Sequence, residues 1–393
     1  MSKFFITTAI DYPNGLPHIG HAYEKVLADV IARYRRLRGD EVFFLTGVDQ
    51  HGQKMQQTAD REGVNVATLA QRNTRKFLAL WEKLGVHYDG WAATTDQNHK
   101  RCVQKILTTL HQEGQLYKKA YRGFYSVRQE QYLTEKDRNE KGDFGNEWGE
   151  VIELEEENWY FKLSEHADWL KEVVSSGDFG IFPEFRRAEV LNAIDRAGET
   201  DLCISRPRER LHWGIEFPFD PDFVTYVWFD ALLNYVSALG WPKDPRFERY
   251  WKHCHHIIGK DILKTHGIYW PCMLKAAGLP VFKKLVVHGH WVVSGSKMSK
   301  SLGNVVNPLE TKDRIGVDGL RYFLLREMSF GEDSNFTEEL ALSRYHGELA
   351  NNLGNLINRS ISMSRSSFDG RIPPRGNVAD QETELYDELD HCL

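Results

Sequence analysis

Several features are scarce or missing in this chain of 393 residues, and each absence excludes a class of protein. No apolar run approaches the roughly 20 residues that a membrane-spanning helix needs, and the first residues lack the pattern of a cleaved secretion signal. The five cysteines form no Cys-x-x-Cys pair, so we expect reduced thiols in a cytoplasmic protein. With 50 basic and 56 acidic residues, the net charge is −6, and any contact with nucleic acid needs local basic patches.

The N-terminal region has the pattern of a nucleotide-binding βαβ unit. Residues 3–10 are a β-prone run that ends at a Pro- and Gly-containing turn, and the apolar residues from His21 to Leu37 have helical spacing. Residues 42–45 are a wholly apolar strand, which is typical of a parallel sheet. In such a unit the ligand lies at the carboxyl ends of the strands, where His18 and Asp49 are both expected.

The rest of the chain predicts an α/β protein with a Rossmann-like parallel sheet that is split by an insertion. A Gly-rich, charged stretch with short aromatic strands interrupts the sheet. Apolar runs at 226–229, 255–259 and 284–288 are expected to be the strands that complete it. The predicted parts are the first half of the catalytic domain (1–115), an α+β connective insertion (116–224), the second half (225–290), a loop and stem-contact region (291–334), and a partial helical domain (335–393).

Two short motifs indicate chemistry on phosphates. His18-Ile19-Gly20-His21 opens a predicted helix, whose free N–H groups and dipole favour an anion. Lys297-Met298-Ser299-Lys300-Ser301 lies in a predicted loop, where lysines can neutralise a leaving pyrophosphate. Taken alone, the histidines could instead cap the helix or bind metal, and the lysines could be a solvated turn. Together the motifs resemble the paired signatures of class I aminoacyl-tRNA synthetases, and residues 3–370 resemble the methionyl-tRNA synthetase family.

The resemblance implies a ligase that activates L-methionine with ATP and Mg²⁺ and then charges tRNA(Met), acting as a cytoplasmic monomer. It also implies the residues that carry the chemistry. The implied catalytic residues are His18, His21, Lys297 and Lys300, and the implied ATP-binding residues are His18, Gly20, His21, Glu24, Gly259, Asp261 and Lys300.

Further strings point to methionine as the amino acid. Asp49-Gln50-His51-Gly52 resembles the family motif whose aspartate binds the substrate ammonium, although a lone Asp after a strand is usually a helix cap. Aromatic walls suit a thioether, and the Tyr235 hydroxyl could donate to the sulfur; a plain aromatic core is the alternative. The implied methionine-binding residues are Ile10, Tyr12, Asp49, Trp228, Ala231, Leu232, Tyr235, Ile262 and His266.

The sequence departs from many family members in the insertion, because the Cys-x-x-Cys zinc knuckles are absent. Cys254-His255-His256 is too contiguous to chelate one ion, so we predict no zinc. Contacts with tRNA are implied for Arg206 and Arg208 near the acceptor end and for Asn355 and Arg359 at the anticodon. A solvated basic loop and an exposed polar helix face are the alternatives.

Other functions remain open from the sequence alone. They are a class I synthetase for another amino acid, a tRNA- or protein-binding paralogue without turnover, and a small-molecule nucleotidyltransferase. After Asn335 the sequence shows one convincing amphipathic helix, which must either dock on the catalytic domain or belong to a longer protein. We therefore expect this chain to activate methionine well but to charge tRNA poorly, with weak dependence on the anticodon.

Overall fold

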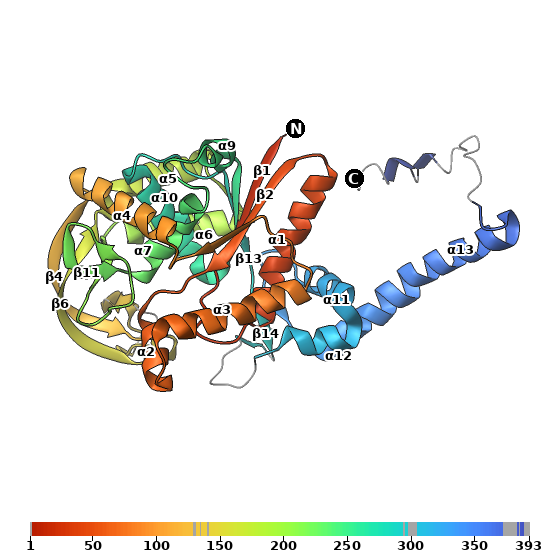
Figure 1. The fold of residues 1–393 in the computed structure, drawn as a ribbon, viewed down its shortest axis with the longest axis horizontal. Coiled ribbons are helices and arrows are strands. Elements are labelled where there is room, and N and C mark those ends of the chain that lie inside the picture. The colour runs from red at the N-terminus through yellow and green to blue at the C-terminus, as the bar shows by residue number, and fades with distance from the viewer. Residues whose placement is uncertain are drawn as a thin grey trace. The chain divides into compact units, whose positions relative to one another are not determined.

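The computed structural model describes residues 2–128, 131–133, 135–139, 141–293, 295–297, 305–371, 383–384 and 386–388. The chain forms two compact units, Met1–Thr337 and Glu338–Leu393. The first unit is built on a six-stranded sheet with the order β3-β2-β1-β12-β13-β7, in which all neighbours are parallel (Figure 1). Its strands are β1 (Lys3–Thr8), β2 (Glu41–Val48), β3 (Gly90–Ala93), β7 (Gly180–Phe182), β12 (Cys254–Gly259) and β13 (Lys284–His288).

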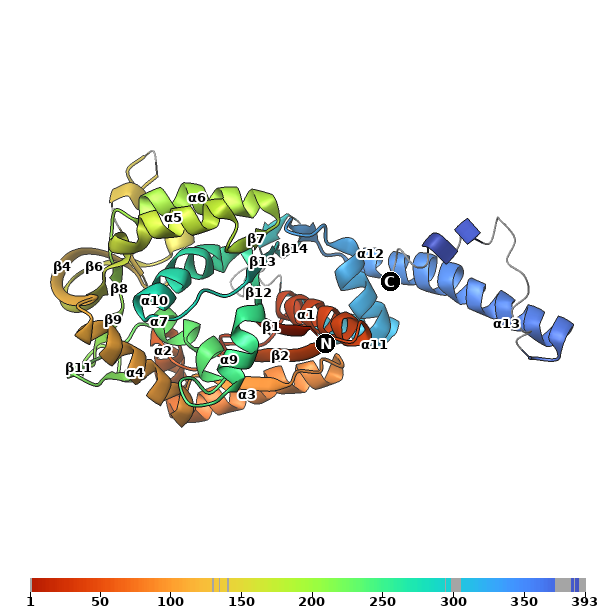
Figure 2. The same cartoon turned by 90° about the horizontal axis from the view of Figure 1, so that it is seen from above.

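The predicted βαβ unit is confirmed at the centre of this sheet. Helix α1 (Ile19–Leu37) connects β1 to β2, and Phe5 of β1 lies in register with Phe43 on one side and Cys254 on the other. Figure 2 shows α1 on one side of the strands and α10 (Trp270–Ala276) on the other. The layers bury the sheet on both faces, as a parallel sheet requires. Further helices of this half are α2 (Gln53–Glu62), α3 (Val66–Lys83) and α4 (Gln97–Gln112).

The insertion has its own antiparallel sheets. One has the order β5-β4-β6-β8, built on the long hairpin of β4 (Leu116–Ser126) and β6 (Val151–Phe161), and the other has the order β10-β11-β9. Strand β7 also comes from this stretch of sequence, yet it pairs with β13 and forms the edge of the parallel sheet. The other elements are β5 (Gln131–Leu133), β8 (Leu202–Cys203), β9 (Ser205–Pro207), β10 (Glu216–Phe217), β11 (Asp220–Thr225), α5 (Ala167–Ser176) and α6 (Glu184–Ala197).

One predicted strand is wrong. Residues 226–229 do not join the sheet, because β11 ends at Thr225 and the chain turns into α7 (Val227–Leu232), followed by α8 (Asn234–Ser237). A strand would have put Trp228 and Asp230 on one face. The helix instead puts Trp228, Ala231 and Leu232 on one face, at positions i, i+3 and i+4. Tertiary packing of this apolar segment overrides its β-propensity.

The remainder of the first unit follows the parallel sheet. A π-helical turn, Thr265–Tyr269, leads into α10; such turns often occur at functional sites. A small sheet contains β14 (Trp291–Val293), β15 (Ser296–Lys297) and β16 (Ser334–Asn335), and α11 (Pro308–Glu327) is kinked at Gly316, where φ is 75°. Helix α9 is Arg246–Tyr250.

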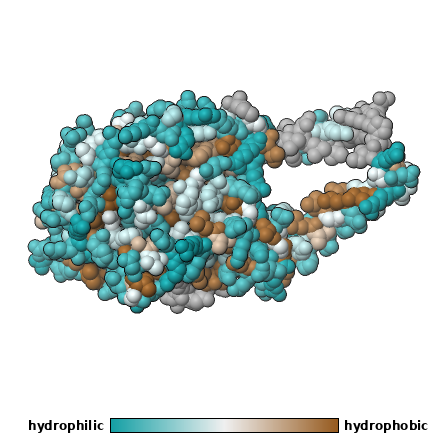
Figure 3. Space-filling view, viewed as in Figure 1, coloured by the Kyte–Doolittle hydropathy of each residue, from teal (hydrophilic) through white to brown (hydrophobic). Residues whose placement is uncertain are grey.

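The second unit is helical. It contains α12 (Glu338–Arg344), a π-helical segment (Tyr345–Gly354) and α13 (Asn355–Phe368). Figure 3 shows hydrophobic surface along α13, where Leu356, Ile357 and Met363 are exposed. Of the helices that the structure describes, none has the length and apolar character to cross a membrane.

Candidate functional site

The histidine pair shapes the N-terminus of α1. His18 is the N-cap residue, and its Nδ1 accepts from the Gly20 N–H at 3.1 Å, while His21 Nδ1 accepts from the His18 N–H at 3.1 Å. In a neutral imidazole that accepts at Nδ1, the proton is on Nε2. Capping through Nδ1 therefore puts the proton of each neutral ring on Nε2, and a phosphate oxygen needs a donor of this kind, so capping and phosphate binding are compatible.

A cavity of about 260 Å³ adjoins this helix N-terminus. It brings together every predicted ATP-binding residue that the structure describes: His18, Gly20, His21, Glu24, Gly259 and Asp261. They come from α1 and from the end of β12, so segments more than 200 residues apart in sequence meet at the carboxyl edge of the sheet, as expected for this fold.

Two further histidines, which the sequence motifs did not identify, line this cavity. His288 ends β13, His290 follows two residues later, and both line the cavity. Their Nε2 atoms lie 3.1 Å from Glu24 Oε2 and 3.0 Å from Asp261 Oδ1, respectively. These contacts orient both carboxylates. Gly289 between them is required by close packing, since a Cβ there would lie 1.8 Å from the Glu332 carbonyl oxygen. The signal was the His-Gly-His string at the end of a predicted strand.

A second cavity, of about 130 Å³, contains all of the predicted methionine-binding residues. Its walls are mainly apolar, and the buried carboxylate of Asp49 lies at the end of β2. The residues that meet here are Ile10, Tyr12, Asp49, Trp228, Ala231, Leu232, Tyr235, Ile262 and His266, together with Ala9, Lys54, Val227 and Asn234.

In this cavity, a hydrogen bond to His266 determines whether the Tyr235 hydroxyl donates or accepts. Burial lowers the pKa of His266 to about 4, so the ring is neutral. Its Nδ1 lies 3.0 Å from the Ile262 carbonyl and must carry the proton, which leaves Nε2 to accept from the Tyr235 hydroxyl at 2.9 Å. While this bond is kept, Tyr235 offers lone pairs to the cavity, and the predicted donation to a sulfur atom does not occur.

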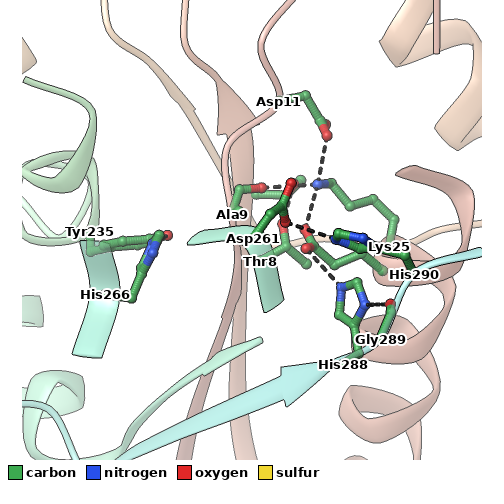
Figure 4. A network of polar contacts seen from close by, with 12 residues as sticks. Thr8, Ala9, Asp11, Lys25, Tyr235, Asp261, His266, His288, Gly289 and His290 are labelled. Atoms are coloured by element: carbon green, nitrogen blue, oxygen red, sulfur yellow. Dashed lines mark hydrogen bonds and ion pairs between the residues drawn. The ribbon is translucent and has the colours of Figure 1, made fainter. Parts of the chain in front are cut away.

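The buried Lys25 side chain bonds to residues that line the two cavities (Figure 4). The Lys25 ammonium donates to the Ala9 carbonyl, to Asp11 Oδ1 and to Glu24 Oε1, each at 2.9 Å, so all three of its donors are used. These bonds tie the end of β1 to the first turns of α1. Ala9 lines both cavities, and Asp11 and Glu24 line the larger one. Lys25 lines neither cavity but fixes the positions of these three residues.

The charges in this cluster predict an unusual pH dependence. Burial raises the pKa of Asp11 from 3.8 to about 7, because the Lys25 charge only partly offsets the loss of water and Glu24 adds repulsion. A carboxyl whose pKa is raised on folding binds its proton more tightly in the native state, so its contribution to stability falls as pH rises from about 4 to about 7. Asp11→Asn should therefore gain stability relative to the wild type across that window, by a few kcal/mol. Urea denaturation of both proteins at several pH values measures this, and a pH-independent difference would contradict it.

Comparison with known proteins gives the family. A family model described as tRNA synthetases class I (M) matches residues 4–142 and 148–361. A methionine–tRNA ligase of Rhizobium meliloti (strain 1021) is 45% identical over 398 residues, which cover 100% of this chain and 76% of the relative. The chain belongs to the methionyl-tRNA synthetase family.

Other members of this family agree over nearly the whole chain. A methionine–tRNA ligase of Deinococcus radiodurans is 44% identical, over 98% of this chain and 57% of the relative. A structure of the Mycobacterium tuberculosis methionyl-tRNA synthetase in complex with methionyl-adenylate superposes with a TM-score of 0.92 at 40% identity. That alignment covers 98% of this chain and 76% of the mycobacterial chain, and it confirms the class I fold.

The lysine motif of this family is only partly described. Lys297 ends β15, in register with Val292. Lys300, with Met298, Ser299 and Ser301, lies outside the described residues. The predicted roles of both lysines stay predictions.

The residues implied to contact tRNA differ in their surroundings. Arg206 is 2% exposed, and its guanidinium lies against the rings of Tyr125, Tyr132 and Tyr226 at 5.4, 5.2 and 4.5 Å. A side chain enclosed in this way supports the insertion and is not placed to meet a phosphate, contrary to the prediction. Arg208 is half exposed and pairs with Glu216 at 2.8 Å, and its contact with tRNA stays a prediction.

The predicted anticodon residues lie on one helix. Asn355 and Arg359 are both in α13, one turn apart, and both are exposed. This places them on a common face, as the spacing predicted. Their contact with an anticodon remains a prediction.

The prediction of a zinc-free protein has a direct test. Over the part of the chain that the structure describes, no three His, Cys, Asp or Glu side chains are grouped so that they could hold a metal ion. We expect purified protein to contain well under one equivalent of zinc, and a chelator to leave its melting temperature unchanged. Stoichiometric zinc in a metal analysis would show the prediction to be wrong.

Proposed function

We propose that this chain activates L-methionine with ATP, forming methionyl-adenylate and pyrophosphate, and then transfers the methionyl group to tRNA(Met). One observation carries the proposal: the two cavities share a wall formed by Ala9, Ile10, Tyr12, Trp228 and Ile262. An amino acid in the apolar cavity and a nucleotide in the histidine-lined cavity would thus be neighbours. Such positioning supplies much of the rate in a reaction between two bound substrates.

The first step needs charge stabilisation more than covalent help. A carboxylate oxygen of methionine attacks the α-phosphorus, and the bond from that phosphorus to the bridging oxygen of pyrophosphate breaks, with no proton transfer required. The Nε2–H groups of His18 and His21 would donate to the phosphate oxygens, on which charge is concentrated in the transition state. Lys297 and Lys300 would neutralise the departing pyrophosphate. ATP enters as its magnesium complex, so Mg²⁺ is part of the substrate.

Recognition of methionine would combine one ion pair, made by its ammonium group, with apolar contacts to its side chain. Asp49, which lines the smaller cavity, would bind the substrate ammonium. Trp228, Ala231 and Tyr235 would surround the thioether, where contacts between sulfur and aromatic rings contribute about 0.3–1.5 kcal/mol. Asp261 would meet the ribose hydroxyls, and Glu24 would lie near the adenine. His290 and His288, respectively, hold these two carboxylates in place.

The second step involves tRNA, and Arg208, Asn355 and Arg359 are the residues we propose for it. We place the activity in the cytoplasm, where translation takes place, and expect the chain to act as a monomer.

Exchange of labelled pyrophosphate into ATP, measured with each amino acid in turn, tests the proposed activation. We expect exchange with methionine and little with the other amino acids. Exchange that depends on leucine, isoleucine, valine or cysteine would indicate a different class I specificity. No exchange with any amino acid would favour a binding protein, and exchange without any amino acid would favour another nucleotidyltransferase.

A further inference from the structure

A buried carboxylate outside both cavities connects distant parts of the site. Asp230 is fully buried, and both of its oxygens accept from histidines: Oδ2 is 2.6 Å from His51 Nδ1, and Oδ1 is 2.7 Å from His99 Nε2. Both histidines are also buried, at 2% and 4% exposure. None of the three residues lines either cavity.

His51 and Asp230 belong to segments that line the smaller cavity, and His99 is bonded to such a segment. His51 follows β2, two residues after Asp49. Asp230 lies in α7, between Trp228 and Ala231. His99 lies in α4, and its Nδ1 is 2.8 Å from the hydroxyl of Ser237, two residues after Tyr235 in α8. A single carboxylate therefore ties together the three segments that carry Asp49, Trp228 and Tyr235.

The loop after β2 is also held by contacts other than the bond between His51 and Asp230. The Trp213 indole N–H donates to the Gln50 carbonyl at 2.5 Å, and the Trp213 ring meets the His51 ring edge-on at 5.5 Å. Gly52 then takes a φ of 100°, which a side chain would strain, and this sharp turn starts α2. With the backbone held on one side by Trp213, the Asp230 bond to His51 fixes the loop on the other side.

The electrostatics keep Asp230 in the form that accepts two hydrogen bonds. Burial disfavours the charged carboxyl, but the two histidines outweigh this cost and hold the pKa of Asp230 below its ordinary value. An ionised carboxylate without its donors would be a costly buried charge, so each histidine bond constrains the geometry strongly.

We infer that Asp230, together with His51 and His99, is a positioning unit that holds the walls of the amino acid cavity and so sets the affinity for methionine. This inference rests on the proposed function. The unit touches neither substrate and acts only through Asp49, Trp228 and Tyr235.

Replacement of His99 tests the inference, because this residue is the member of the unit furthest in sequence from the cavity-lining residues. His99→Ala leaves one Asp230 oxygen without a donor, and we expect the KM for methionine in pyrophosphate exchange to rise about tenfold, as loss of a charge-assisted bond to a buried group implies. The KM for ATP should change less than about twofold, because Trp228 is the only one of the three residues Asp49, Trp228 and Tyr235 that also lines the nucleotide cavity. His99→Gln should restore most of the affinity, since its amide N–H can donate from a similar position.

Matched variants separate positioning from general damage. His166 is a half-buried histidine in the insertion, bonded through Nε2 to Gln115 Oε1 at 2.7 Å, and we expect both His166→Ala and His166→Gln to leave the KM for methionine unchanged. Should His99→Ala fail to fold, Ser237→Ala removes only the hydroxyl that orients His99, and a rise of about threefold in the same KM is expected.

The possible outcomes are distinct. Equal rises in the KM values for methionine and ATP, no rise in either, or a Gln variant as impaired as the Ala variant would each overturn the inference. A wild-type protein without methionine-dependent exchange would overturn the proposed function instead.

Discussion

His21→Ala is expected to slow adenylate formation at least about a hundredfold while leaving methionine binding nearly unchanged. Removing one preorganised donor from a developing negative charge commonly costs about 10²–10³ in rate. The His21 Nδ1 is already used at the helix start, so the Nε2–H is the part of the ring that can act on a phosphate. An interaction made mainly in the transition state lowers turnover and not ground-state affinity. Rapid-quench measurement of adenylate formation, with equilibrium dialysis of labelled methionine, gives both quantities.

The structure also supplies a control that separates capping from catalysis. His18 caps α1 by accepting the Gly20 N–H, a role that asparagine performs well. His18→Asn should therefore keep the helix start and the melting temperature, yet lose the Nε2–H and slow adenylate formation as strongly as His21→Ala does. If His18→Asn retained the wild-type rate, or if rate and methionine affinity fell together, the histidines would be structural.

Asp49→Asn is expected to raise the KM for methionine about a hundredfold, because a charge-assisted bond to a buried group is lost. Asp49 is 6% exposed, and its backbone N–H donates to the Asp11 carbonyl at 2.8 Å, so the position of Asp49 at the end of β2 is well defined. Asparagine fills the same space but cannot pair with an ammonium. The KM for ATP should change little, since Asp49 lines only the smaller cavity.

Steady-state pyrophosphate exchange at varied methionine and varied ATP measures both constants. Asp201→Asn is a control for the same chemical change: the Asp201 carboxylate accepts from the Tyr117 hydroxyl at 2.8 Å and from the Ser164 hydroxyl at 2.6 Å, but it lies in the insertion. It should leave the KM for methionine unchanged. An unaltered KM for methionine in Asp49→Asn would remove Asp49 from the ammonium site.

Much of the site could be predicted because local signals and sheet topology act together. The spacing of apolar residues predicted the first βαβ unit. In a parallel sheet, the carboxyl ends of the strands lie at the same edge of the sheet. This is why Asp49 after β2 and Gly259 at the end of β12 lie at the same edge of the sheet, although 210 positions separate them. The proposed roles of these residues await the experiments above.

The resemblance could not show which predicted side chains are enclosed. The basic segment around Arg206 has the composition of a solvated loop, yet its guanidinium is surrounded by tyrosine rings from β4, β5 and the segment after β11. Spacing along one strand carries no information about what lies opposite it, so burial of Arg206 could not be predicted.

Local pattern and residue chemistry were enough to predict the family, the histidine motif at the start of α1 and the residue types that line both cavities. Three features emerged only from the folded chain: residues 227–232 are helical, β7 from the insertion joins the main sheet, and Asp230 binds His51 and His99. Each of these depends on contacts between segments far apart in the chain. Such contacts are selected by packing and by the cost of burying an unpaired charge, neither of which a short stretch of sequence expresses.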